Sequence, residues 1–186
     1  MPEVLRLLVT PFLGLPKRCE RANLSPRFSG TGSGGIEMSA VSPFDYPTPF
    51  TQTLVVGEAH IDGLNHANNA VYVQWCEAVA WAHSQALGLS LEDYGRLNRA
   101  MAIARAEYDY IRPALLGDSL TLCTWLTHSD GRLSMTRRFQ LLRGDTTLMR
   151  GLWQLACIDM QSGRPARMPA EFRAVYEPAI VEVAHV

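Results

Sequence analysis

Lysine is almost absent from this chain of 186 residues: of its 17 basic residues only Lys17 is a lysine, and the others are arginines. The 18 acidic residues nearly balance them and leave a formal net charge of −1. With so little net charge, we expect no charge-driven binding to nucleic acid or to an anionic membrane surface. No apolar run approaches the roughly 18 residues that a transmembrane helix requires, so we expect no membrane span either.

Cysteine is scarce and scattered. The four cysteines form no C-x-x-C pair and stand far apart, at Cys19, Cys76, Cys123 and Cys157. This spacing argues against a zinc knuckle, a thiol redox motif and a disulfide scaffold. We therefore predict four reduced thiols in a cytoplasmic protein. The hydrophobic fraction of 47% is ordinary for a globular protein, and the length suits one domain with a tail.

Proline and glycine are unevenly distributed and gather before residue 50. Seven of the 11 prolines lie there, and the glycine- and serine-rich run at residues 29–35 is typical of a flexible linker. We predict a flexible N-terminal extension over residues 1–45, with Met38 as an alternative start of the protein. A single domain over residues 46–178 and a C-terminal tail over residues 179–186 complete the expected organisation.

The first half of the predicted domain combines a strand with a long helix. Apolar and β-branched residues predict a strand over residues 53–59. A helical pattern follows from residue 70 to 87, with Asn68 suited to be its N-cap and Gly88 its left-handed C-terminal cap. Apolar side chains occupy most of the circumference of this helix, so we expect it to be covered on several sides. A capping box then predicts a short second helix over residues 90–97.

The second half changes to a period of two, which indicates strands. A last short helix is expected near residues 170–176, and the four predicted strands are residues 101–111, 119–129, 133–143 and 146–160. We predict an α+β fold in which a curved antiparallel sheet wraps around one long helix. Because such a sheet leaves edges to cover, we also expect self-association.

The segment that joins the first strand to the long helix contains the candidate chemistry. Residues 60–72 are His-Ile-Asp-Gly-Leu-Asn-His-Ala-Asn-Asn-Ala-Val-Tyr. This segment resembles the 4-hydroxybenzoyl-CoA thioesterase family of hotdog-fold acyl-CoA thioesterases, in which an Asp, a Gly-His-x-Asn-Asn segment and a Tyr lead into the central helix. The residues that fall on this pattern are Asp62, His66, Asn68, Asn69, Tyr72 and Glu77. Motifs at residues 108–113, 117–118 and 159–169 match as well, so the resemblance covers about residues 50–177.

The resemblance implies a hotdog fold and hydrolysis of the thioester of an acyl- or aroyl-CoA to free acid and CoA. It gives Asp62 the role of general base or of nucleophile, and the sequence does not choose between them. It places the oxyanion donor at Asn69, through the main-chain N–H at the start of the helix, where partial positive charge gathers. The alternative for Asp62 is structural, with a carboxylate that only caps the loop before the helix.

Two further residues are candidates for catalysis. Glu77 stands two helical turns after Asn69, and in another thioesterase branch of the same fold a helix carboxylate is catalytic. Its alternative role is a hydrogen-bonded partner that fixes the helix against the sheet. His66 could pair with Asp62, or it packs at the entry to the helix. Asn65 stands where the family usually has glycine, and asparagine is the least costly replacement if that position needs a positive φ.

The substrate-binding candidates come from the same resemblance. Tyr72 and Asn68 are two of them, and Tyr72, together with Trp75, is core or acyl-pocket lining. At the nucleotide end of coenzyme A, paired arginine donors would bind phosphate. The residues in question are Arg132 and Ser134, with Arg137 and Arg138 nearby. Their alternative role is a set of solvated charges at a strand edge.

The resemblance also implies a homodimer or homotetramer that takes acyl-CoA as its partner and needs no cofactor. His60, Asp62 and His66 match no metal-ligand spacing, so we predict no metal site. Two other functions stay open. An enoyl- or hydroxyacyl-CoA hydratase of the same fold would use an Asp/His dyad that Asp62 and His66 almost supply. A non-catalytic acyl-CoA-binding module would bind coenzyme A without turnover.

Overall fold

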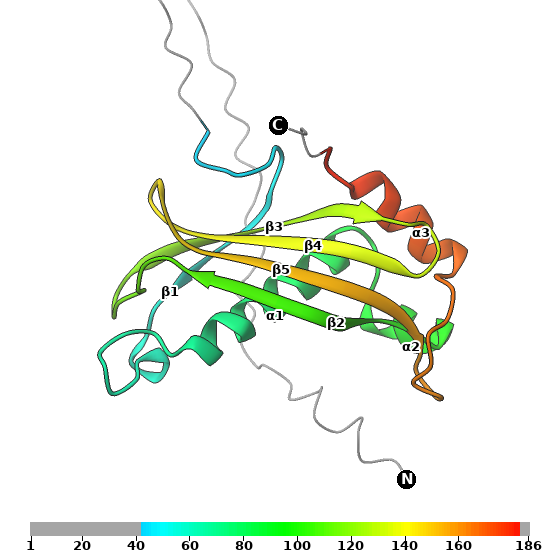
Figure 1. Cartoon of the computed structure of the whole chain (residues 1–186), viewed down its shortest axis with the longest axis horizontal. Coiled ribbons are helices and arrows are strands. Elements are labelled where there is room, and N and C mark those ends of the chain that lie inside the picture. Colours follow the sequence, from blue (N-terminus) through cyan, green and yellow to red (C-terminus); the bar gives the residue numbers. More distant parts are fainter. Residues whose placement is uncertain (1–41, 183–186) are drawn as a thin grey trace, which may run out of the picture. The chain divides into compact units, whose positions relative to one another are not determined.

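Five antiparallel strands form a sheet in the order β1-β3-β4-β5-β2 in the computed structural model, which describes residues 42–182 (Figure 1). Their bounds are β1 Phe50–Val55, β2 Arg99–Tyr110, β3 Ser119–Ser129, β4 Ser134–Arg143 and β5 Thr146–Asp159. The last four follow the predicted period-two segments to within two residues at each end. The predicted antiparallel sheet is therefore confirmed, and β1 and β2 are its two edges.

Strand β1 lies earlier in the chain than predicted. It begins at Phe50 rather than at residue 53, because Phe50 pairs with Thr124 of β3. It ends at Val55, which pairs with Ser119. Ser119 is the first residue of β3, so β3 offers no partner further along, and the chain turns into the 3-10 helix η1 (Glu58–His60). Strand propensity does not report where a distant partner strand starts.

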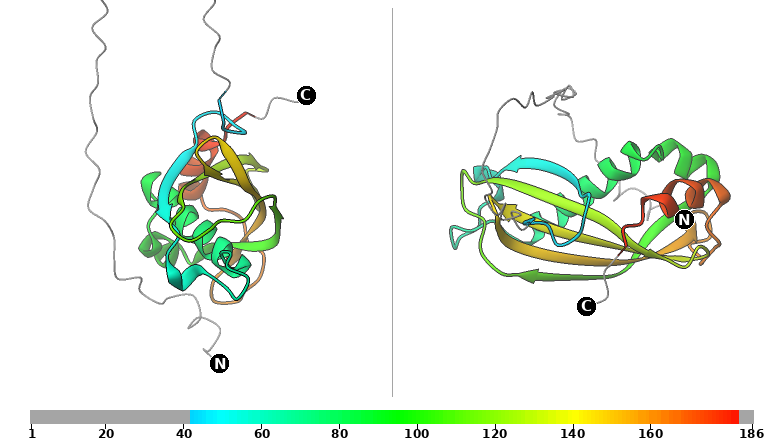
Figure 2. Two further views of the ribbon diagram at one scale, coloured as in Figure 1. Left: turned by 90° about the vertical axis from the view of Figure 1, so that its left-hand side faces the viewer. Right: turned by 90° about the horizontal axis from the view of Figure 1, so that it is seen from above.

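The long helix α1 (Asn69–Ala86) lies against one face of the sheet, which curves around it (Figure 2). The Asn68 side chain caps its first turn by accepting a hydrogen bond from the Ala70 amide at 2.9 Å. Gly88 follows the last turn with a φ of 102°. Both caps are as predicted. The core between helix and sheet includes Cys76 and Val79 of α1, Leu122 of β3, Phe139 of β4 and Leu155 of β5.

We expected cover on several sides of helix α1, and among residues 42–182 one face of the helix stays exposed. Val73, Gln74, Glu77 and Ala78 are exposed, and Val73 is 37% accessible although it is apolar. The sheet covers only the face that includes the buried positions. The described part of the chain therefore leaves the apolar residues of the other face uncovered.

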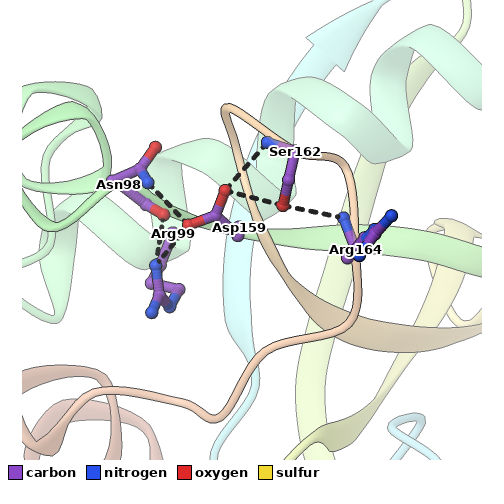
Figure 3. Close-up of polar contacts among 5 residues, drawn as sticks. All are labelled: Asn98, Arg99, Asp159, Ser162 and Arg164. Atoms are coloured by element: carbon purple, nitrogen blue, oxygen red, sulfur yellow. Dashed lines mark hydrogen bonds and ion pairs between the residues drawn. The ribbon is translucent and has the colours of Figure 1, made fainter.

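A polar network holds the start of β2 to the end of β5 (Figure 3). Helix α2 (Leu91–Leu97) ends at Asn98, which has a left-handed φ of 50°. The Asp159 carboxylate accepts hydrogen bonds from Asn98 Nδ2 at 2.6 Å and Arg99 Nη1 at 2.9 Å. It also accepts from the amide and the hydroxyl of Ser162, at 2.8 and 2.9 Å. Four donors thus converge on one carboxylate at this corner of the sheet.

Residues 43–47 form a strap across the face of the sheet opposite α1. The Tyr46 ring packs edge-on against Trp125, with 5.5 Å between ring centroids. The Asp45 carboxylate accepts two hydrogen bonds from the Arg150 guanidinium, at 2.7 and 2.8 Å. Such bidentate pairing fixes orientation as well as position. The strap therefore belongs to the folded unit.

After β5, the chain forms α3 (Ala170–Tyr176) and η2 (Glu177–Ala179) and returns to β3, where the Val181 amide donates to the Leu126 carbonyl at 2.9 Å. Contacts with the sheet thus extend past both limits that we expected, residues 46 and 178. The predicted extension up to residue 41, with Met38, and the tail from residue 183 lie outside the described residues. No helix within residues 42–182 has both the length and the apolarity to cross a bilayer.

Candidate active site

A hydrogen-bonded loop, residues 61–68, leads from η1 to the start of α1. The Asp62 amide donates to the His66 carbonyl at 2.9 Å, and the Asn65 amide donates to the Asp62 carbonyl at 3.0 Å. Asn65 has a φ of 62°, in the left-handed region that asparagine tolerates better than most residues. The position does need a positive φ, and asparagine keeps the turn. These bonds fix the backbone that holds Asp62.

The Asp62 side chain is half-buried and uses only one oxygen within the loop. Its Oδ1 accepts hydrogen bonds from the Leu64 amide at 2.8 Å and the His66 amide at 3.5 Å. Its Oδ2 receives no hydrogen bond from a described residue. The capping role that we considered as an alternative is therefore present. It leaves the second oxygen available, so capping and catalysis do not exclude each other.

The first turn of α1 presents an unused amide. The two amides that follow it are already bonded to Asn68. Its Oδ1 accepts a hydrogen bond from the Ala70 amide and its carbonyl accepts one from the Val71 amide, both at 2.9 Å. The Asn69 amide has no acceptor among residues 42–182, and Asn69 is exposed. Its carbonyl accepts a hydrogen bond from the Tyr110 hydroxyl at 3.2 Å. Partial positive charge at a helix start makes such an amide a donor for anionic oxygen.

Tyr72 links three segments around this helix start. Its side chain is 3% exposed, and its hydroxyl accepts a hydrogen bond from the Ala114 amide at 2.9 Å. The Ala114 carbonyl in turn accepts from the Ala67 amide at 2.9 Å. Burial raises the pKa of Tyr72 above its ordinary value. The hydroxyl is thus engaged inside the protein, and it joins α1, the segment after β2 and the loop.

Aromatic rings surround the start of α1, and they include Tyr110, which was not among the predicted site residues. The Tyr72 ring lies 5.2 Å from both Trp75 and Tyr110, measured between centroids, and Trp75 lies 5.3 Å from His60. Tyr110 is the last residue of the edge strand β2 and is 42% exposed. Its place in the motif at residues 108–113 was the available signal, but only the fold brings it to Asn69.

His66 and Glu77 are exposed, and neither side chain makes a hydrogen bond or ion pair with a described residue. His66 contacts Asp62 through its backbone amide, so the side-chain pair that we considered is not formed. Glu77 points from the uncovered face of α1. The alternative in which Glu77 fixes the helix to the sheet by a hydrogen bond is therefore wrong.

The predicted nucleotide-binding residues lie at the other end of α1 in the same chain (Figure 1). The turn between β3 and β4, which contains Arg132 and precedes Ser134, lies beside α3, whereas the loop with Asp62 lies at the start of α1. The 18 residues of α1 span about 27 Å at 1.5 Å each. Arg137 is only 2% exposed, inside the core, so a contact of Arg137 with phosphate is excluded. Arg138 projects to the opposite face.

A comparison with known families gives one match over most of the described chain. Residues 56–175 match the family model described as the thioesterase-like superfamily. The match includes the loop with Asp62, all of α1 and strands β2 to β5.

Individual relatives agree with this match. The long-chain acyl-CoA thioesterase FadM of Escherichia coli is 25% identical over 126 residues, which are 65% of this chain and 92% of that protein. A hypothetical protein of Staphylococcus aureus, solved in complex with CoA, superposes with a TM-score of 0.66 at 22% identity, over 75% of this chain and 90% of that one. A 1,4-dihydroxy-2-naphthoyl-CoA thioesterase of Synechocystis gives 0.63 at 20% identity, over 69% and 96%. The predicted hotdog fold is confirmed.

Proposed function

The chain belongs to the thioesterase-like superfamily and is a thioester hydrolase, and from this premise we propose that it hydrolyses an acyl- or aroyl-CoA to the free acid and CoA. The similarity to FadM and to the Synechocystis enzyme, both named as acyl-CoA or aroyl-CoA thioesterases, supports this substrate class.

In the proposed reaction Asp62 either activates the attacking water or itself attacks the thioester carbonyl carbon. As a general base, its free Oδ2 takes a proton from water while the water oxygen attacks the thioester carbonyl carbon. The tetrahedral intermediate then collapses, the carbon–sulfur bond breaks, and the CoA thiolate leaves and takes up a proton. As a nucleophile, the carboxylate would displace CoA to give an anhydride, which water hydrolyses. Both routes need an available carboxylate oxygen.

The Asn69 amide is the proposed donor to the oxyanion. A backbone donor of this kind is typically worth about 3–4 kcal/mol of barrier, because it meets charge that develops only in the transition state. The observation that supports the proposal most is that one loop–helix junction contains both an Asp62 oxygen and an Asn69 amide without a hydrogen-bond partner among the described residues.

Asp62→Asn tests the proposal with little risk to the fold, since an asparagine oxygen can still accept the Leu64 amide. Thiol release should be measured on fatty acyl-CoAs of several lengths and on aroyl-CoAs. We expect kcat/KM to fall about 10²- to 10⁴-fold, the usual contribution of a positioned base. Asp145→Asn, an exposed carboxylate in the β4–β5 turn, is the matched control and should keep wild-type turnover. Wild-type turnover in Asp62→Asn would refute the assignment.

The structure lends no support to the hydratase alternative, because His66 and Asp62 do not form a side-chain pair. Thiol release without a change in a double bond would decide between the two reactions. Tight binding of CoA without any turnover would instead favour the non-catalytic module.

The proposed active form is a homodimer or homotetramer. Asp62 is half-buried and Asn69 is exposed, and two apolar features have no partner among residues 42–182. These are the uncovered face of α1 and the edge strand β2, where Ile103 is 47% exposed. A second copy would also bring another Arg132 and Ser134, which a single chain places at the far end of α1. Light scattering coupled to size exclusion should give a mass above 20.6 kDa, in multiples of it.

A further inference from the structure

A buried cation without an anionic partner lies under the last turns of α1. Arg137 is 2% exposed, on the α1 side of β4. Its Nη1 donates to Thr124 Oγ1 at 3.2 Å and to His83 Nδ1 at 3.1 Å, and both acceptors are uncharged in this arrangement. None of the ion pairs formed by residues 42–182 includes Arg137. A buried charge is costly unless it is paired, so this guanidinium lacks a counter-charge.

Tyrosines close to Arg137 do not supply that charge. The Tyr94 hydroxyl is hydrogen-bonded to the Tyr176 hydroxyl, which also donates to Ser84 Oγ at 2.9 Å. Burial raises the pKa of Tyr94 far above its ordinary value, so Tyr94 is a neutral phenol at physiological pH. The environment of the guanidinium therefore consists of neutral acceptors.

His83 is hydrogen-bonded to Arg137 and also lines a cavity. Because its Nδ1 accepts from Arg137, the neutral imidazole has its proton on Nε2. Burial, together with the charge of Arg137, lowers the pKa of His83 to about 4, which keeps the ring neutral. His83 Nε2 has no partner among residues 42–182. Among them only Arg138 Nε is both unpartnered and fully buried, and His83 is one of the residues that line a cavity beside the end of α1.

The cavity is partly open to solvent and has a volume of about 460 Å³, within the range of small-molecule sites. Its walls are mostly apolar and include Leu87, Trp125, Ala179 and Ile180. Thr124 also lines it, but its hydroxyl is occupied by Arg137 and by the Arg138 carbonyl. The cavity thus combines an apolar wall with one N–H donor that has no partner among the described residues, on a histidine that is only 8% exposed.

Two further features of the lining bear on the ligand. Thr48 has a φ of 46°, a strained conformation for a β-branched residue, and such strain gathers at ligand sites. Glu182 also lines the cavity but is exposed, so water screens its charge. The carbonyls of the last turn of α1 are already capped, since the amides of residues 87–89 donate to those of residues 83–85. Neither the carboxylate nor the helix end therefore cancels the attraction of Arg137 for an anion.

We propose that this cavity is a second ligand site, which binds an apolar monocarboxylate. The carboxylate accepts the Nε2–H of His83 and compensates the charge of Arg137, while the apolar body lies against Leu87, Trp125 and Ile180. Along α1, His83 is 14 residues from Asn69, or about 21 Å, so the site is separate from the candidate active site. The proposal does not depend on the hydrolytic activity.

Octanoate is the probe for this site, and 1-octanol is its uncharged counterpart. Long-range proton–nitrogen spectra of the full-length, ¹⁵N-labelled protein report each imidazole, and His83→Phe, which keeps the ring packing, assigns the His83 signal. We expect octanoate to shift the His83 Nε2 signal saturably, at a concentration at least tenfold below that needed for 1-octanol. Asp62→Asn should bind octanoate as the wild type does.

Ala179→Phe provides the test that does not disturb the buried polar groups. The larger side chain fills the cavity from its wall, so the octanoate response of His83 should be lost while the resting His83 signal stays near its wild-type position. Three results would overturn the proposal: an unmoved His83 signal at saturating octanoate, equal affinity for octanoate and 1-octanol, or wild-type octanoate binding by Ala179→Phe.

Discussion

Replacing Tyr72 with phenylalanine should weaken the whole loop–helix junction. The substitution removes one oxygen and leaves the ring in place. The Ala114 amide, whose residue is fully buried, then loses its acceptor. An unsatisfied buried donor costs about 1–3 kcal/mol, which is more than the net value of an ordinary hydrogen bond. With a denaturant slope of about 2 kcal/mol/M, the urea midpoint should fall by about 0.5–1.5 M with an unchanged slope.

Tyr110→Phe is the matched control for this measurement. It also removes a tyrosine hydroxyl beside α1, but the Tyr110 side chain is 42% exposed, and water can replace its bond to the Asn69 carbonyl. Its effect on the free energy of unfolding should stay within about 0.5 kcal/mol. If urea denaturation showed Tyr72→Phe to be no more destabilising than Tyr110→Phe, the inference that Tyr72 satisfies a buried amide would be refuted.

Three other predictions follow from the same contacts. Since the pKa of His83 is lowered to about 4 in the folded protein, the unfolded chain binds the extra proton first as pH falls below 6.5. Stability should therefore drop by about 2 kcal/mol between pH 7 and pH 5 on account of this group, and urea midpoints of His83→Phe should show a flatter pH profile over that range. Asp159→Ala should lower the melting temperature, because four donors at the β2–β5 corner lose their acceptor. Calorimetry with Asp145→Asn as the control tests this, and a melting temperature equal to that of the control would contradict a stabilising role of Asp159. Thiol reagents should modify the buried cysteines Cys76, Cys123 and Cys157 only after unfolding, because burial raises the pKa of each thiol. Rapid labelling of any of them in the native protein would contradict this.

Local signals in the sequence predicted the helix ends well. The Asn68 cap, the left-handed Gly88 and the capping box between Ser90 and Asp93 all occur as expected, because each depends on residues within four positions of one another. The placement of β1 failed for the opposite reason, since its bounds are set by β3, some 70 residues away. The strap was missed because a proline-rich segment gives no local sign of the Arg150 and Trp125 that bind it.

The same distinction between local and long-range contacts applies to the candidate site. Asp62, Asn69 and the turn at Asn65 are close in sequence, and the expected turn and helix start are present. Tyr110 reaches Asn69 only through the fold of β2. Arg137 was expected near phosphate, yet it alternates with Met135, Phe139 and Leu141 on the apolar face of its strand, and that period was the sign of burial.

The strap also decides which surfaces are left for larger assemblies. Tyr46 and Asp45 occupy the outer side of β3, β4 and β5, where flat stacking against another sheet would otherwise be open. Stacking there would first have to peel this peptide away and break its bidentate ion pair with Arg150. While the strap stays in place, a second copy of the chain could pack only against the edges of the sheet or against its helical side.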